Sequence, residues 1–248
     1  MTYCLALALQ EGLVFASDSR SNAGSDYVTT YGKTHVFDLG PDRFFVILTA
    51  GNLATTQETI NRLWRDVNAG DGRPSLHTPN HLFEAANLVG EVLQDVRDDH
   101  EPGMSRDGQS GSATLILGGQ IAGEAPNIFL IYPQGNAITA SSDTPYLQIG
   151  ESKYGKPVLD RILTPSMSLA DGARLALVSL DATVKSNATV GMPFDVSLYR
   201  RDGFTLASSQ RFERDSPAYQ HINNTWSKAL TTTLAQLHNE PIPDWYLG

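Results

Sequence analysis

Thr2 follows the initiator methionine directly, and a threonine in this position can become a nucleophile that carries its own base. Removal of Met1 would expose the α-amine of Thr2 beside its hydroxyl oxygen Oγ. A free α-amine has a pKa of about 7.7 to 8.0, so a useful fraction is neutral near pH 7 and can accept the hydroxyl proton. A threonine paired with its own amine is one of the convergent variants of the catalytic triad. Most threonines at the second position are ordinary strand residues. The residues expected to lie near Thr2 must therefore decide whether it is a nucleophile.

Lys33 and Asp18 have the residue types that such a nucleophile needs around it. An ammonium group near Oγ would favour the alkoxide electrostatically, and a carboxylate would hold that ammonium in place. The alternative is a surface lysine and an aspartate that caps a turn. The sequence does not fix the strand register that would separate these two interpretations.

The first two apolar segments predict a hairpin that brings these groups together. Residues 3–9 and 13–20 are β-prone, and the Gln-Glu-Gly turn between them pairs residues whose numbers add to roughly 22 or 23. This pairing places positions 19–21 beside Thr2. A third segment at 27–39 then carries the lysine back past the aspartate.

The segment "RFFVILTAG" ends at Ala50-Gly51 and leads directly into a helical pattern. Backbone N–H groups at the start of a helix are suited to stabilising a developing oxyanion. An ordinary strand-to-helix turn is the commoner meaning of such a segment. The combination with Thr2, Asp18 and Lys33 therefore carries more weight than the segment itself.

The remaining elements alternate between sheet and helix. The first fifty residues are predicted as an antiparallel sheet, and apolar spacing at i, i+3, i+4 and i+7 predicts helices after it. We expect helices at 54–67 and 81–96, strands at 112–121 and 127–140, helices at 152–163 and 168–185, a strand at 194–203 and a helix near 221–238. This order predicts an α+β fold, a four-layer α/β/β/α sandwich of two antiparallel sheets, built as a single domain over residues 1–248.

Composition excludes several classes of function. The net charge of −9, without a basic cluster, argues against nucleic acid as a partner. No apolar run approaches the ~20 residues of a membrane span, and the opening lacks the basic residues of a signal peptide, so we expect a cytoplasmic protein. The six histidines lack metal-ligand spacing, and no nucleotide-binding glycine loop is present, so neither a metal nor a cofactor is expected. Cys4 is expected to be a buried apolar residue, and "GQSGS" at 108–112 a loop.

Several motifs together resemble one known family. They are the threonine start, "FASDSR", "YGKTHVF" and "TAGNLATTQ", followed in order by "PQGNAITA" and "IGESKYGKPVLD". In combination they resemble the proteasome β-subunit superfamily of N-terminal nucleophile hydrolases, over nearly the whole chain. The opening, without a propeptide, looks most like the Anbu branch, the bacterial ancestral β subunits.

The resemblance implies a threonine-type peptidase that hydrolyses peptide amide bonds through an acyl-enzyme. It implies assembly of identical copies into a ring or spiral and a peptide or protein substrate, and it leaves open a separate ATPase as a further partner. The implied roles are nucleophile and base for Thr2, activating cation for Lys33, partner of that cation for Asp18, oxyanion donor for the Gly51 N–H, substrate contacts for Ser21, Tyr31 and Thr49, and support for Arg20 and Ser152.

Two segments depart from the family pattern. Gly150-Glu151-Ser152 stands where the family has Gly-Ser-Gly, and Ser186 to Gly191 lacks the acid of the family's Asp-x-x-Ser-Gly-Gly loop. Proton handling around the amine is therefore expected to differ. Two alternatives stay open: an amidohydrolase of the same fold acting on a small molecule, and a non-catalytic scaffold subunit.

Overall fold

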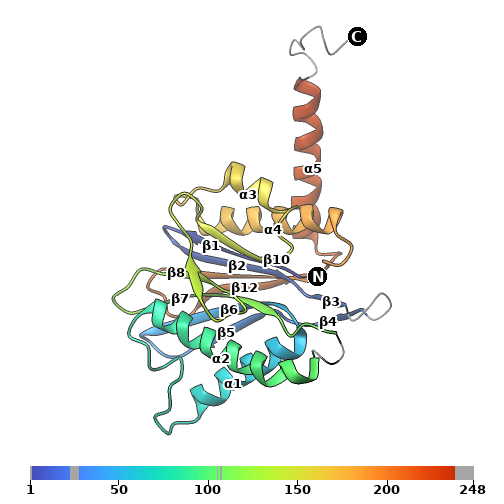
Figure 1. Ribbon diagram of the computed structural model, residues 1–248. Coiled ribbons are helices and arrows are strands. Elements are labelled where there is room, and N and C mark those ends of the chain that lie inside the picture. The colour runs from blue at the N-terminus through green and yellow to red at the C-terminus, as the bar shows by residue number, and fades with distance from the viewer. Residues whose placement is uncertain (1, 23–27, 105, 107, 238–248) are drawn as a thin grey trace.

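The computed structural model describes residues 2–22, 28–104, 106 and 108–237. Two five-stranded antiparallel sheets lie face to face, and helices cover both outer faces (Figure 1). A two-stranded ribbon, β3 (Arg20–Asn22) with β4 (Val28–Thr30), lies beside the sheets. The arrangement confirms the predicted four-layer α/β/β/α sandwich.

The first sheet contains the start of the chain in an interior position. Its strand order is β10-β1-β2-β11-β12, and the helices α3 and α4 cover its outer face (Figure 1). The bounds are β1 (Tyr3–Leu9), β2 (Gly12–Asp18), β10 (Tyr146–Gly150), β11 (Phe194–Arg200), β12 (Leu206–Phe212), α3 (Lys156–Ile162) and α4 (Leu169–Ser186).

The second sheet has the order β5-β6-β7-β8-β9 and packs against α1 and α2. Both helices occupy the regions where apolar spacing predicts them. The bounds are β5 (Thr34–Asp38), β6 (Arg43–Gly51), β7 (Ala113–Ile121), β8 (Asn127–Ile131), β9 (Ala137–Thr139), α1 (Leu53–Asn68) and α2 (Leu82–Met104).

Alternation along β1 divides its side chains between two cores. Tyr3, Leu5 and Leu7 pack in the cluster under α3 and α4, whereas Cys4 and Ala6 pack in the cluster between the two sheets. Successive strand residues point to opposite faces, so Thr2 has the same parity as Cys4. The strand therefore directs position 2 toward the seam between the sheets.

The first fifty residues do not form one sheet, as the sequence predicts, but are shared between two. β1 and β2 belong to the first sheet, β5 and β6 to the second, and the β3–β4 ribbon lies between them along the chain. Both sheets bury apolar strands on both faces, so alternation alone does not show where the chain changes sheet. Strands β10 and β12 were also missing from the sequence prediction; β12 is mostly exposed and lacks an apolar stripe.

The β1–β2 hairpin is tighter than the sequence predicts. The structure pairs Cys4 with Ser17 and leaves a two-residue turn, because Gly12 belongs to β2. A Cβ at Gly12 would lie 2.0 Å from the backbone oxygen of Tyr199 on β11, so the glycine serves a close strand approach instead of the turn. In this register the Asp18 carboxylate reaches Tyr3 and accepts its N–H at 3.0 Å.

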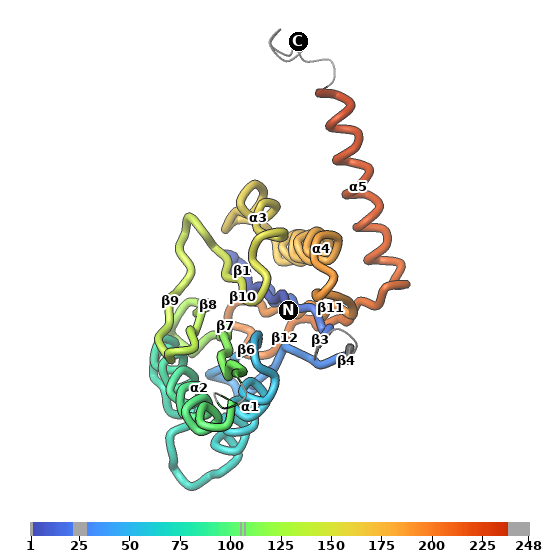
Figure 2. Tube along the Cα trace, turned by 45° about the vertical axis from the view of Figure 1, so that its right-hand side comes forward, coloured from blue at the N-terminus to red at the C-terminus, as the bar shows by residue number. Residues whose placement is uncertain are grey.

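Helix α5 (Pro217–Leu237) is anchored at its start and stands away from the sheets over its later turns (Figures 1 and 2). Near the start, the buried carboxylate of Asp181 accepts a hydrogen bond from the Tyr219 hydroxyl at 2.6 Å. Farther along, three leucines spaced on one side are exposed, Leu230, Leu234 and Leu237. This helix therefore presents an unpaired apolar stripe.

Candidate active site

A cavity of about 630 Å³ opens where the start of β1, the β3–β4 ribbon, the end of β6 and the first turn of α1 meet. Residues far apart in the sequence converge here because two sheets and a ribbon end at the same place. Six of the predicted site residues line it: Thr2, Ser21, Tyr31, Lys33, Thr49 and Gly51.

The Lys33 ammonium group is buried and held by two oxygen atoms. Its Nζ lies 2.6 Å from Asp18 Oδ1 and 2.6 Å from the backbone oxygen of Arg20. The fully buried Asp18 carboxylate also accepts the Tyr3 N–H at 3.0 Å and the Gly191 N–H at 3.1 Å. Burial raises the pKa of the Asp18 carboxyl, while Lys33 and both N–H donors act in the opposite direction. The result is a fixed cation in the cavity wall.

Arg20 and Ser152 lie outside the set of residues that line the cavity. The Arg20 side chain turns toward the α4–β11 connection, where Nη1 donates to the backbone oxygen of Ala188 at 2.8 Å. Arg20 contributes to the site through its backbone oxygen on Lys33. Ser152 is exposed, and its backbone N–H donates to Glu151 at 2.9 Å.

The backbone of Thr2 is tied to the end of β10. The Thr2 carbonyl accepts the Glu151 N–H at 2.6 Å. Gly150, with φ of 82°, packs so closely that a Cβ there would lie 2.0 Å from the Thr2 oxygen. The segment where the family has Gly-Ser-Gly thus meets the nucleophile candidate through backbone atoms.

Gly51 lines the cavity, and the direction of its N–H follows from its neighbours on β6. On β6 the Thr49 N–H donates to the Lys33 carbonyl at 3.0 Å, whereas the Asn52 N–H donates to Ser112 on the β7 side at 2.9 Å. Strand N–H groups alternate in direction, so Gly51 points to the same side as Thr49, beyond the end of β5. The Asn52 side chain caps α1 by accepting the Thr55 N–H at 3.2 Å.

His35 and Gln109 are among the cavity residues that the sequence prediction lacks. His35 lies on β5, two residues after Lys33 in the segment predicted as one strand, so period-two alternation was a usable signal for it. Burial lowers the pKa of His35 to about 4, so its ring is neutral at pH 7. Gln109 reaches the cavity from the 108–112 segment, which is a loop as predicted, and no pattern in the sequence indicates this approach.

Cys4 is buried in the core between the sheets and does not line the cavity. Burial raises the pKa of its thiol, and Sγ lies 3.6 Å from the Thr49 carbonyl. A thiol in this state is a packing group, as the sequence predicts.

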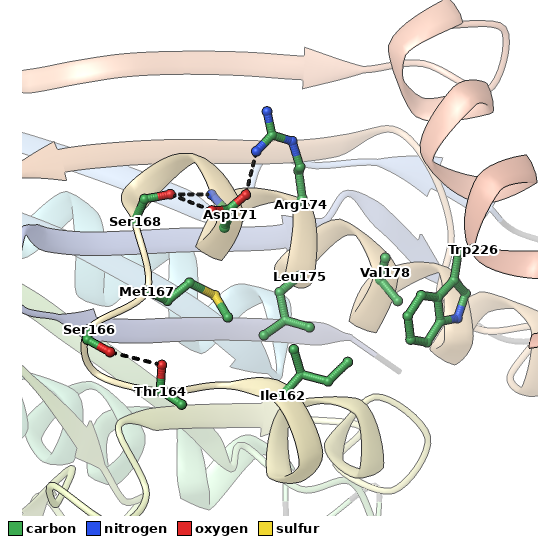
Figure 3. A pocket seen from close by; sticks show the side chains of 10 residues that line it. All are labelled: Ile162, Thr164, Ser166, Met167, Ser168, Asp171, Arg174, Leu175, Val178 and Trp226. Carbon is green, nitrogen blue, oxygen red and sulfur yellow. Dashed lines mark hydrogen bonds and ion pairs between the residues drawn. The ribbon is translucent and has the colours of Figure 1, made fainter. Parts of the chain in front are cut away.

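Figure 3 shows a second concavity, of about 610 Å³, between the α3–α4 region and α5. Its wall is mainly apolar, with Ile162, Leu175 and Trp226 among its side chains. The charged groups there, Asp171 and Arg174, pair with each other at 2.6 Å. None of the predicted site residues lines this concavity.

Within the described part of the chain, no group of three or more His, Cys, Asp or Glu side chains has the geometry of a metal site. None of the helices described there has the length and apolar character needed to cross a bilayer.

Comparison with known proteins identifies the family. No family model matches the chain. Proteasome subunit beta of Halobacterium salinarum is 22% identical over 213 residues, which cover 86% of this chain and 79% of that protein. The structure of Anbu, described as the ancestral beta-subunit, from Yersinia bercovieri is 42% identical with a TM-score of 0.89, covering 97% of this chain and 100% of that one. The structure titled the helical assembly of the Anbu complex, from Pseudomonas aeruginosa, is 43% identical with a TM-score of 0.87, over 97% of this chain and 98% of that one. At this identity over almost the entire length, the chain belongs to the Anbu family of proteasome-like proteins with the N-terminal nucleophile hydrolase fold.

Proposed function

We propose that this protein is a threonine-type hydrolase in which Thr2, after removal of Met1, attacks peptide amide bonds. Met1 lies outside the described residues. The observation that carries the proposal is the Lys33 ammonium group, fixed at 2.6 Å by Asp18 and lining the same cavity as Thr2. Burial of a cation costs desolvation energy, which the Asp18 carboxylate offsets here, and a buried charged pair at a cavity wall is typical of functional sites.

Acylation begins with transfer of the Thr2 Oγ proton to the neutral α-amine of the same residue. Oγ then forms a bond to the substrate carbonyl carbon, and the carbonyl oxygen becomes an oxyanion that the Gly51 N–H stabilises. The Lys33 ammonium favours the ionised Oγ electrostatically. When the carbon–nitrogen bond breaks, the α-ammonium group returns the proton to the leaving amine, and an ester on Thr2 remains.

Deacylation uses the same groups in reverse roles. The free α-amine takes a proton from water, the resulting hydroxide attacks the ester carbonyl, and the proton passes back to Oγ as the acid leaves. This cycle requires neither a metal nor a separate histidine. His35 is neutral at pH 7, so it adds no second cation to the cavity wall.

The cavity volume of about 630 Å³ suits a peptide side chain with its flanking backbone. Ser21, Tyr31 and Thr49 are proposed to contact this substrate. A reducing cytoplasm fits a chain with a single cysteine. A separate ATPase would be needed to unfold protein substrates, because the chain has no nucleotide-binding glycine loop.

Self-assembly into a ring or spiral is the second part of the proposal. The relative from Pseudomonas aeruginosa, 43% identical, is described as a helical assembly. In this chain α5 carries Leu230, Leu234 and Leu237 with 54%, 69% and 56% exposure, a stripe that a second copy can cover.

The decisive experiment combines mass spectrometry of the N-terminus with covalent labelling by a β-lactone that acylates threonine. We expect the mature chain to begin at Thr2 and to gain one adduct there. Thr2→Ala should abolish labelling and the hydrolysis of fluorogenic peptides, while Thr2→Ser should keep both at reduced rate. Hydrolysis of acyl-amides but not of peptides would instead support the small-molecule amidohydrolase. A mature chain that retains Met1, or a Thr2→Ala variant that hydrolyses substrate as the parent does, would refute the proposal.

A further inference from the structure

We infer that Glu151 and Asn187 form a clamp that positions Thr2, an inference that rests on the proposed role of Thr2 as nucleophile. Both residues lie in the segments where the chain departs from the proteasome-type pattern. In the structure these two departures contact each other, with Asn187 Nδ2 donating to Glu151 Oε2 at 2.8 Å. The two changes therefore form one interacting unit, the Glu151–Asn187 clamp.

The peptide group between Thr2 and Tyr3 is held at both of its polar atoms. The Thr2 carbonyl accepts the Glu151 N–H at 2.6 Å, and the Tyr3 N–H donates to Asp18 Oδ1 at 3.0 Å. The torsion about the Thr2 Cα–C bond sets where the α-amine and Oγ lie relative to this plane. The orientation of the proposed nucleophile therefore depends on the plane of the Thr2–Tyr3 peptide group, which Glu151 and Asp18 hold in place.

The Glu151 carboxylate is satisfied by three donors. Oε1 accepts the N–H groups of Lys153 and Ser152, both at 2.9 Å, and Oε2 accepts from the Asn187 amide. The residue is 6% exposed. The Lys153 N–H first, and then the Asn187 and Ser152 donors, lower the pKa of Glu151 by stabilising its ionised form. The carboxylate therefore holds the turn after β10 in one shape.

Asn187 extends the contact to the other side of the same peptide group. Its Oδ1 accepts the Thr189 N–H at 3.0 Å and the Thr189 hydroxyl at 2.6 Å, and its backbone oxygen accepts the Val190 N–H at 3.2 Å. The turn built in this way presents the Gly191 N–H to Asp18 Oδ2 at 3.1 Å. Hydrogen bonds that lead back to Glu151 and to Asn187 therefore hold the Thr2–Tyr3 peptide group from both sides.

The donor and the acceptor of the hydrogen bond between Asn187 and Glu151 can be exchanged without changing the shape of either side chain. In Glu151→Gln the new amide faces the Asn187 amide, donor against donor, because Asn187 Oδ1 is occupied by Thr189. In Asn187→Asp a second carboxylate faces Glu151, acceptor against acceptor. The double variant Glu151→Gln/Asn187→Asp restores one donor and one acceptor, and every other contact of the clamp is kept.

The test is the rate of β-lactone labelling at Thr2, resolved into the maximal rate and the half-saturating concentration. We expect each single variant to lower the maximal rate about tenfold with the half-saturating concentration within about twofold, because misplacement of reacting atoms slows chemistry more than binding. The double variant should recover most of the rate. Glu91→Gln, an exposed residue on α2, is the matched control and should label as the parent does.

Hydrogen exchange of the Glu151 and Gly191 amides gives a second readout that needs no catalysis. Both amides should exchange about tenfold faster in each single variant and return toward the parental rate in the double variant. Absence of labelling in the parent would count against the proposed function, and the exchange rates would still decide on the clamp. Single variants with parental labelling and exchange, or a double variant worse than both singles, would overturn the inference.

Discussion

Lys33 obtains its orientation from oxygens on two different elements. Asp18 ends β2, and the Arg20 backbone oxygen begins β3, so the ammonium group is held where the chain leaves the first sheet. Both partners of the ion pair are buried, with 5% exposure for Lys33 and 0% for Asp18. Such a pair contributes little net stability, but removal of one partner leaves the other charge uncompensated.

Replacement of Lys33 alone should therefore lower both the free energy of unfolding and the reactivity of Thr2. We expect Lys33→Met to abolish labelling at Thr2 and to lower the free energy of unfolding by about 3 kcal/mol. Asp18→Asn combined with Lys33→Met removes both charges, so it should regain part of that stability without regaining labelling. Denaturant titration and the β-lactone assay measure the two effects separately. A Lys33→Met variant that labels normally would exclude Lys33 from the reaction.

His35 should make the protein less stable in acid. Burial lowers its pKa from the ordinary 6.5 to about 4, so the unfolded chain binds this proton before the folded chain does. The stability that neutral His35 contributes above pH 6.5 should decline as pH falls toward 4, by about 3 kcal/mol in total. Denaturant titrations of His35→Gln between these values should show a shallower decline than the parent. His77→Gln, at an exposed histidine, should keep the parental slope.

At the scale of elements, the cavity depends on where strands end. β6 ends at Gly51 and α1 begins at Leu53, so the strand delivers its last N–H groups next to a capped helix start. β10 ends at Gly150, directly against Thr2. β6 pairs with β7 from Arg43 to Gly51, and the edge strand β10 pairs with β1 along its whole length, so a neighbouring strand holds each of these ends.

We expect that Gly150 cannot be replaced by a residue with a side chain. Comparison with Gly72 separates the effect of a contact from that of backbone strain. Gly150 and Gly72 have φ of 82° and 79°, but only at Gly150 would a Cβ meet another group, the Thr2 oxygen at 2.0 Å. Gly72→Ala should cost about 1 kcal/mol of backbone strain and leave labelling unchanged. Gly150→Ala should displace Thr2 and lower labelling about a hundredfold. Similar labelling of the two variants would show that contact with Thr2 is not limiting.

The sequence predicts elements better than their connections. Helices α1, α2 and α4 carry apolar faces that period-3.6 spacing identifies. Conversely, the change of sheet after Asp18 has no local signal, because β2 in the first sheet and β6 in the second are both buried on both faces. Lys33 and Asp18 could be proposed as partners because the predicted hairpin brings Asp18 toward Thr2 and the third segment carries Lys33 back past Asp18. The link between Glu151 and Asn187 could not, since it depends on two turns 36 residues apart meeting behind Thr2.

At the scale of the whole molecule, the proposed chemistry and the proposed assembly occupy different regions. The cavity lies at the seam between the sheets, whereas the later turns of α5 extend past α4 and away from both sheets (Figure 2). The exposed leucine stripe can therefore be changed without touching the site.

Charges on the stripe should reduce self-association. We expect Leu230→Glu combined with Leu234→Glu to shift the mass measured by light scattering toward single protomers, because burial of two charged side chains at an interface is unfavourable. Phe83→Glu on α2 is the matched control, since Phe83 and Leu230 are both 54% exposed. An unchanged mass for the leucine variant would place the contacts between copies elsewhere.

The interior position of β1 has a practical consequence for work with this protein. Strands β10 and β2 flank β1 on both sides, and Thr2 comes immediately before it. A purification tag fused ahead of Thr2 would begin at the cavity wall, and it would convert the amine that the proposed mechanism requires into an amide. Recombinant material should therefore carry its tag after residue 248, or be released by a protease that leaves threonine as the first residue.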